Sequence, residues 1–162
     1  MGSSTNLSRY QSGFPIKKSL CPAPITNASW TKLSDGKIVF LAFRRDLVAD
    51  APERVTIRVI AKVMRTMTFG PSGKPVFANL ENLWAVRGNS YEFRVAPLSE
   101  TQEMIAIRSE SDDFSFPAGR YALMLKGQAY DFSVEGPITE SVQCLERTEA
   151  VNGAVYSECR SP

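Results

Sequence analysis

The sequence predicts an all-β, single-domain protein, built as an antiparallel β-sandwich or an open barrel with an irregular N-terminal arm. Short segments of alternating apolar and polar residues recur along the chain, Gly, Pro, Asn and Asp separate them, and no segment has a convincing long helical pattern. With 162 residues, the chain can bury most of its apolar surface in one domain. We therefore expect an arm at 1–29 and a β domain at 30–162.

The arm is predicted from a polar stretch that Gly and Pro interrupt repeatedly. The first regular unit follows at 30–43, where Ser-Asp-Gly-Lys at 34–37 is a turn signal. The run at 38–43 is apolar at nearly every position. Because both faces of such a strand are apolar, we expect a central strand covered on both sides.

Residues 50–67 fit two structures. An Asp cap, an early Pro and valines at four-residue spacing favour a helix. The many β-branched residues favour a long strand, because they lose side-chain freedom in a helix and pack well on a sheet. We expect the strand. Its inward side chains would be Val55, Ile57, Val59, Ala61 and Val63, and its outward ones Arg54, Thr56, Arg58 and Lys62.

Short strands and turns are predicted to alternate through the middle of the chain. Strands are expected at 83–86, 91–95 and 104–108, a loop at 70–75, a turn at Gly88-Asn89 and an acidic loop at 109–113. The acidic loop lacks the glycine and the distal glutamate of an EF-hand. We therefore favour a solvated loop over a calcium site.

The clearest prediction is a β-hairpin at 117–134. Lys126-Gly127 lies between its arms, where a two-residue turn needs positive φ. This register pairs Leu123 with Tyr130 and Tyr121 with Phe132 on the core side. On the other face, Arg120 would form a cross-strand ion pair with Asp131.

Cys144 and Cys159 flank a turn at Asn152-Gly153 and are 15 positions apart. We favour a disulfide, because both lie in a polar tail where a free thiol would be poorly buried. Such a bridge contributes about 3 kcal/mol in the chain-entropy description. The alternative is three reduced thiols, with Cys21 as the third. Short strands are expected at 141–145 and 154–157.

The composition excludes several kinds of chemistry. The chain has no histidine, which removes histidine-based nucleophile activation, histidine general bases and histidine-ligated metals. A net charge of +2 is too small to predict a nucleic-acid partner. No stretch is long and apolar enough for a transmembrane helix. We expect no cofactor, no metal and no enzymatic activity.

A resemblance to other sequences indicates a cellular location. The strand Arg-Val-Thr-Ile-Arg-Val from Arg54 and the hairpin entry Phe-Pro-Ala-Gly-Arg-Tyr-Ala-Leu, with Pro117, Gly119, Tyr121 and Leu123, resemble those of uncharacterised exported bacterial β-sandwich proteins. The resemblance covers about 54–134. It implies a periplasmic or secreted location but supplies no catalytic residue.

Four residues are candidates for binding. Trp30 and Trp84 are large aromatic side chains of the kind that anchor partners or stack on sugars, although core positions are the alternative. Arg58 and Lys62 belong to a basic stripe that could meet acidic groups, although a solvated face is the alternative.

The sequence thus predicts a non-catalytic binding module of the bacterial cell envelope, with a protein or glycan as its partner. One alternative is a structural accessory domain whose edge strands pair within an oligomeric assembly. The other is a carboxylate-based polysaccharide hydrolase, which needs two carboxylates in one cleft.

Overall fold

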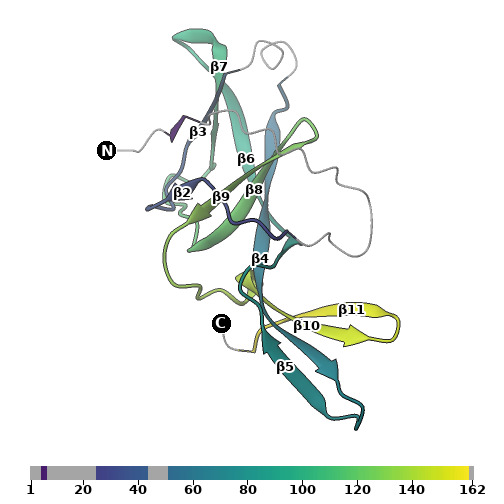
Figure 1. Cartoon of the computed structure of the whole chain (residues 1–162). Helices are drawn as coiled ribbons and strands as arrows, with labels where there is room; N and C mark the ends of the chain where they lie inside the picture. The colour runs from purple at the N-terminus through teal and green to yellow at the C-terminus, as the bar shows by residue number, and fades with distance from the viewer. Residues whose placement is uncertain (1–4, 7–24, 44–50, 161–162) are drawn as a thin grey trace.

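The computed structural model describes residues 5–6, 25–43 and 51–160, and there the protein is a mixed β-sheet curled into a half-barrel (Figure 1). The all-β prediction is confirmed, and the open barrel describes the architecture better than two stacked sheets. The elements are β1 (Thr5–Asn6), β2 (Lys32–Leu33), β3 (Phe40–Phe43), β4 (Arg54–Phe69), β5 (Pro75–Asn79), β6 (Trp84–Leu98), β7 (Thr101–Arg108), β8 (Gly119–Leu125), β9 (Gln128–Val134), the 3-10 helix η1 (Ser141–Gln143), β10 (Cys144–Ala150) and β11 (Gly153–Glu158).

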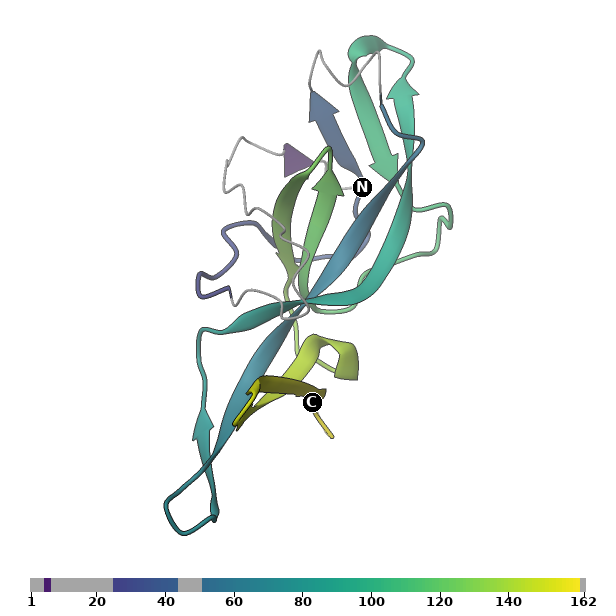
Figure 2. The same ribbon diagram turned by 90° about the vertical axis from the view of Figure 1, so that its right-hand side faces the viewer.

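The long strand β4 organises the sheet. Its first part pairs with β6 on one side and β8 on the other, within the order β1-β3-β7-β6-β4-β8-β9-β2. Its last part pairs with β5 and, in parallel, with β10, and β11 pairs with β10. Figure 2 shows β4 running from the half-barrel into this second group of strands. The strand interpretation of 50–67 is confirmed from Arg54 to Met67, whereas position 50 lies outside the described residues.

We use the name distal sheet for β5, β10, β11 and the last part of β4, residues 62–69. The first part of β4 and the remaining strands are called the half-barrel. The predicted disulfide joins Cys144, the first residue of β10, to Cys159, which follows β11, with Cα atoms 5.4 Å apart, and so closes the open end of the β10–β11 hairpin. A small apolar cluster below the half-barrel includes Val63 and Leu145, with Tyr156 packed against it. The bridge closes the hairpin on itself, whereas the cluster and the parallel β4–β10 pairing hold the hairpin on β4.

Aromatic side chains fill the concave side of the half-barrel. The ring of Phe116 lies 4.7 Å from that of Tyr121 and 5.3 Å from that of Phe93, measured between centroids. Phe132 stacks on Tyr121 from the next strand. All four side chains are buried. Because aromatic rings bury large apolar areas and attract one another edge to face, we expect this layer to contribute a large share of the folding free energy.

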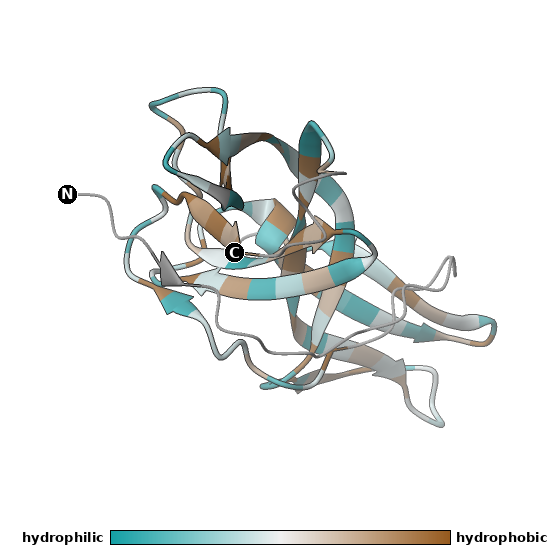
Figure 3. Cartoon of the chain, turned by 90° about the horizontal axis from the view of Figure 1, so that it is seen from above, coloured by the Kyte–Doolittle hydropathy of each residue, from teal (hydrophilic) through white to brown (hydrophobic). Residues whose placement is uncertain are grey.

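The hairpin prediction is confirmed in detail. Tyr121 pairs with Phe132 and Leu123 with Tyr130. Lys126 and Gly127 both have positive φ, as a two-residue turn matched to strand twist requires. The alternation is visible in Figure 3, where hydrophobic and hydrophilic residues follow one another along the strands.

Two local predictions are wrong. The run at 38–43 is not a strand covered on both faces, since Val39 is 45% and Phe43 58% exposed, and β3 starts only at Phe40. The predicted turn at Gly88-Asn89 is absent from the described β6, which continues from Trp84 to Leu98. A shift in the β4–β6 register between Arg58 and Ile60 accommodates these residues as a bulge instead.

Candidate functional site

The candidate site lies on the convex face of the sheet, opposite the aromatic layer. Strand register places Trp84 beside Lys62, and one row further on it aligns Ile60 with Arg120. The same row continues through Ser133. Residues that pair across strands point to the same face, so apolar and charged side chains meet here.

Part of the predicted N-terminal arm forms a wall of this site. Ile25 and Trp84 exchange two main-chain hydrogen bonds, of 2.8 and 2.9 Å, and Ile25 is almost buried. Further along, the Ser133 amide donates to the Thr31 carbonyl at 2.9 Å. Residues 25–31 therefore lie across the convex face, whereas the arm's residues 7–24 are outside the described part.

Arg120 is the best-anchored charge of the site, with 7% of its surface exposed. Its Nε donates to an Asp131 carboxylate oxygen at 3.1 Å, and Nη2 donates to the same oxygen. Nη1 donates to the Asn27 carbonyl at 2.7 Å. The guanidinium also lies over the Trp84 ring, 5.0 Å from its centroid. A charge this deep needs such partners, and together they fix the orientation of the indole.

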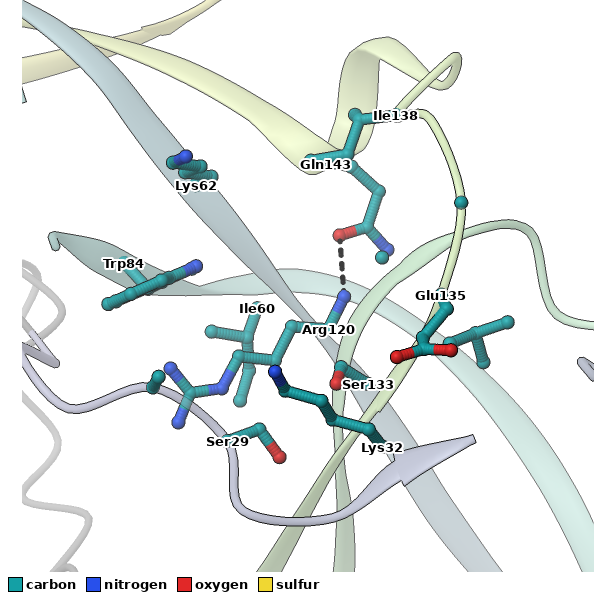
Figure 4. A pocket seen from close by; sticks show the side chains of 14 residues that line it. Ser29, Lys32, Ile60, Lys62, Trp84, Arg120, Ser133, Glu135, Ile138 and Gln143 are labelled. Carbon is teal, nitrogen blue, oxygen red and sulfur yellow. Dashed lines mark hydrogen bonds between the residues drawn. The ribbon is translucent and has the colours of Figure 1, made fainter. Parts of the chain in front are cut away.

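A hollow of about 230 Å³ opens beside this pair. Figure 4 shows Lys62 and Trp84 on one side, Glu135 on the other and Arg120 between them. Its lining residues are Ala28, Ser29, Lys32, Ile60, Lys62, Trp84, Gly119, Arg120, Ser133, Val134, Glu135, Gly136, Ile138 and Gln143.

The charges of this hollow are not balanced. Arg120 is neutralised by Asp131, as described above. Neither Lys32 nor Lys62 has an ion-pair partner within the described ranges. Glu135 is the one carboxylate among the lining residues. Two ammonium groups and one carboxylate thus face the hollow, which favours a ligand with negative charge.

Gln143 closes the inner end of the hollow from η1. It is 1% exposed, and its Oε1 accepts a hydrogen bond of 3.3 Å from the Arg120 amide. The side chain lies directly over Gly119, whose φ is +153°. A β-carbon on residue 119 would be 2.3 Å from the amide carbon of Gln143, well inside contact distance. Glycine is therefore required where β8 begins.

The tyrosines belong to the opposite side of the sheet. Burial raises the pKa of the Tyr121 hydroxyl well above its ordinary value; Tyr91 raises it further, and the Gln143 side chain partly opposes the rise. Burial also raises the pKa of Tyr91, with a smaller contribution from Glu140. The Tyr121 hydroxyl donates to the Pro117 carbonyl at 2.7 Å. Both phenols therefore stay protonated at neutral pH.

Of the four predicted binding residues, the structure brings Trp84 and Lys62 together. Trp30 is 82% exposed and Arg58 is half-buried, and neither lines the hollow. The core alternative is therefore wrong for Trp30. For Trp84, which is half-buried under Arg120, the indole is part of the site wall.

Sequence reasoning missed most of the polar lining. Arg120 and Asp131 were predicted as an ion pair, which is confirmed, but not as support for Trp84. Lys32, Glu135 and Gln143 carried no signal, because each reaches the hollow from a separate part of the chain. The alternation of apolar and polar residues along β8 could have indicated that Arg120 lies on the same face of the sheet as Lys62.

Comparisons with known proteins found no family model, no curated protein and no solved structure that matches this chain. In the described ranges, no group of three or more Cys, Asp or Glu side chains is placed to hold a metal ion. Those ranges also contain no helix with the length and apolar character needed to cross a membrane.

Proposed function

We propose that this protein is a non-catalytic binding module of the bacterial cell envelope, periplasmic or secreted. Its hollow on the convex face receives an anionic group of an envelope protein or glycan. One observation carries the proposal: Lys62 and Lys32 face the hollow without ion-pair partners in the described part of the chain, beside an indole that Arg120 holds in place.

The chemistry of the hollow fits recognition. Ammonium groups at an open rim attract a carboxylate or phosphate without a fixed geometry. The half-buried Trp84 offers apolar surface to a sugar ring or a side chain. Arg120 and Asp131 are already paired, so they position the indole and leave the lysines to meet the ligand.

The two alternatives receive different support. A paired-carboxylate hydrolase needs a second carboxylate facing the first, and the hollow contributes only Glu135. A structural accessory domain is favoured by a separate observation, namely the exposed apolar side chains of the distal sheet, such as Phe69 and Phe77.

The proposal is tested by titration with three probes: an oligosaccharide of uronic acid units, a neutral oligosaccharide of equal length, and a peptide rich in Asp and Glu. Trp84 supplies the fluorescence signal, with a Trp30→Phe background removing the other indole. We expect saturable binding of one anionic probe and none of the neutral sugar. Whether the sugar or the peptide saturates tells which partner class is served.

The matched variants are Lys62→Gln and Lys37→Gln, each of which removes one positive charge. Lys62 lines the hollow, whereas Lys37 is exposed elsewhere. Losing one close charge contact is expected to weaken binding about fivefold to tenfold, near 1 kcal/mol. Equal loss in both variants, or no saturation by either anionic probe, contradicts the proposal.

A further inference from the structure

The edge of the distal sheet is an unusually apolar strand. All five residues of β5 are exposed, none is charged, and Val76 and Phe77 are 52% and 55% exposed. In the described part of the chain, β5 pairs with β4 alone. Edge strands are normally protected by charges, because their free main-chain groups can pair with another strand. Here Pro75 is the sole protective residue.

The register of β5 fixes which main-chain groups are free. Leu80 donates to the Met64 carbonyl at 2.9 Å, and Gly70 donates to the Lys74 carbonyl at 3.0 Å. Hydrogen bonding alternates along an antiparallel pair, so Val76 and Ala78 also turn their main-chain groups toward β4.

The outward groups follow from the same alternation. They are the N–H and C=O of Phe77 and Asn79 and the C=O of Pro75. Pro75 has no N–H, so this edge presents two donors and three acceptors, with Phe77 at the centre.

We propose that β5 pairs with β5 of a second copy of this chain, antiparallel and with the two-fold axis at Phe77. The Phe77 N–H of each copy donates to the Phe77 C=O of the other, and each Asn79 N–H donates to the opposite Pro75 C=O. All outward donors of the strand are then satisfied. A register shifted by one residue would face groups already bonded to β4 and is therefore excluded. Among the registers that align outward groups, we place the axis at Phe77, the middle of the five-residue edge, where Pro75, Phe77 and Asn79 all take part.

Charge complementarity identifies the occupant as a second copy in this orientation. Lys74 precedes the strand and Glu81 follows it, both exposed and both without an ion-pair partner in the described ranges. Antiparallel pairing places the Lys74 end of one strand beside the Glu81 end of the other, twice over. A parallel pair would instead bring the two lysines together.

The resulting assembly joins two distal sheets into one sheet with β5 strands at its middle. A five-residue edge is short compared with stable interfaces, which bury about 1,200–2,000 Å². We therefore expect a weak dimer that dissociates on dilution, with Kd on the order of tens of micromolar. This inference does not rest on the proposed ligand site, which lies on the half-barrel.

The test is sedimentation velocity of the full chain from about 1 to 500 µM, a range chosen to bracket a weak interface. We expect monomer at low concentration and dimer at high concentration. Phe77→Lys places like charges on the axis and should abolish the dimer. Val155→Lys is the matched control, because Val155 is a 58% exposed valine on the other edge strand, β11. It should leave dimerisation unchanged.

Two further variants keep the test decisive if Phe77→Lys disturbs the stacking of Arg65 on that ring. Asn79→Pro removes an outward N–H that β4 does not use, and it should weaken the dimer at least tenfold. Lys74→Glu should weaken the dimer as well, and the exchange Lys74→Glu with Glu81→Lys should restore it.

Three results overturn the inference. They are a monomer at all concentrations, a dimer that survives both Phe77→Lys and Asn79→Pro, and a dimer lost equally with Val155→Lys. Ligand titration reads a different surface, so failure of the dimer and failure of the binding proposal are separable.

Discussion

The two parts of β4 have similar residues and opposite surroundings. In the first part, Ile57 and Val59 are at most 1% exposed. In the last part, Met64 is 44% and Phe69 58% exposed, although both are large and apolar. One continuous strand thus runs from a closed core into solvent.

The difference lies in what faces each part. The first part is opposed by the aromatic layer around Phe116, which the curl of the half-barrel brings over it. The last part has neighbours within its own sheet, β5 and β10, but only the small cluster with Leu145 and Tyr156 beside its start. Pairing satisfies main-chain hydrogen bonds in both parts, whereas burial needs a second layer.

The largest expected effect is the difference in stability loss between two matched aromatic substitutions, one in the core layer and one in the distal sheet. Phe93→Ala removes a 1% exposed ring from the core layer and should destabilise the protein by about 3–5 kcal/mol. Phe69→Ala removes a 58% exposed ring and should change the unfolding free energy by no more than about 0.5 kcal/mol. Urea denaturation followed by circular dichroism measures both. Similar losses would mean that the distal sheet is covered in solution.

The sequence predicted the strands of the half-barrel better than those of the distal sheet. The alternation of apolar and polar residues predicted the inward side chains of β4 and the hairpin at 117–134. Such a two-residue period can be read within each segment, and the strands that contact these side chains are direct neighbours in the sheet. The β5 strand was not predicted: Pro75 and the nearby glycines signal a turn, which predicts the loop at 70–75, and no element was predicted at 76–79. Its pairing with β4 depends on how far β4 extends, which no local pattern encodes.

The site was predicted less well than the fold. Trp84 and Lys62 were selected separately, for aromaticity and for charge, and their proximity comes from β4–β6 register. Gln143 reaches the hollow through η1 and packs where Gly119 leaves room. Such a contact joins positions 24 residues apart without any repeat or spacing, so only the three-dimensional structure reveals it.

Removing the disulfide should give the next largest loss of stability. Because the bridge lies in the distal sheet, its removal should affect that part and leave the half-barrel protected. Replacing Cys144 and Cys159 by alanine removes a 15-residue loop closure and should cost about 3 kcal/mol. Hydrogen exchange should accelerate most in β10 and β11, while β8 and β9 keep their protection. Unfolded, unreduced wild-type protein should titrate one thiol, that of Cys21. Three thiols would contradict the bridge.

The smallest effect concerns the joint between the two parts. Gly119→Ala would force a β-carbon to 2.3 Å from the Gln143 amide at a φ of +153°, so the buried Gln143 side chain must move and the backbone of residue 119 is strained. Strain and displacement of this kind typically cost about 1–3 kcal/mol. Gly88→Ala is the control, because Gly88 is exposed in β6 with open space where the β-carbon would be. It should change stability by less than about 0.5 kcal/mol.

Gln143→Ala combined with Gly119→Ala shows whether the contact itself is responsible. If Gln143 is what the new methyl group meets, shortening it should recover part of the lost stability, since the two residues are in direct contact and their effects are not additive. Additive losses would place the strain in the backbone of β8 alone. In that case the distal hairpin would be held by its pairing with β4 and by the cluster around Val63 and Leu145, without help from Gln143.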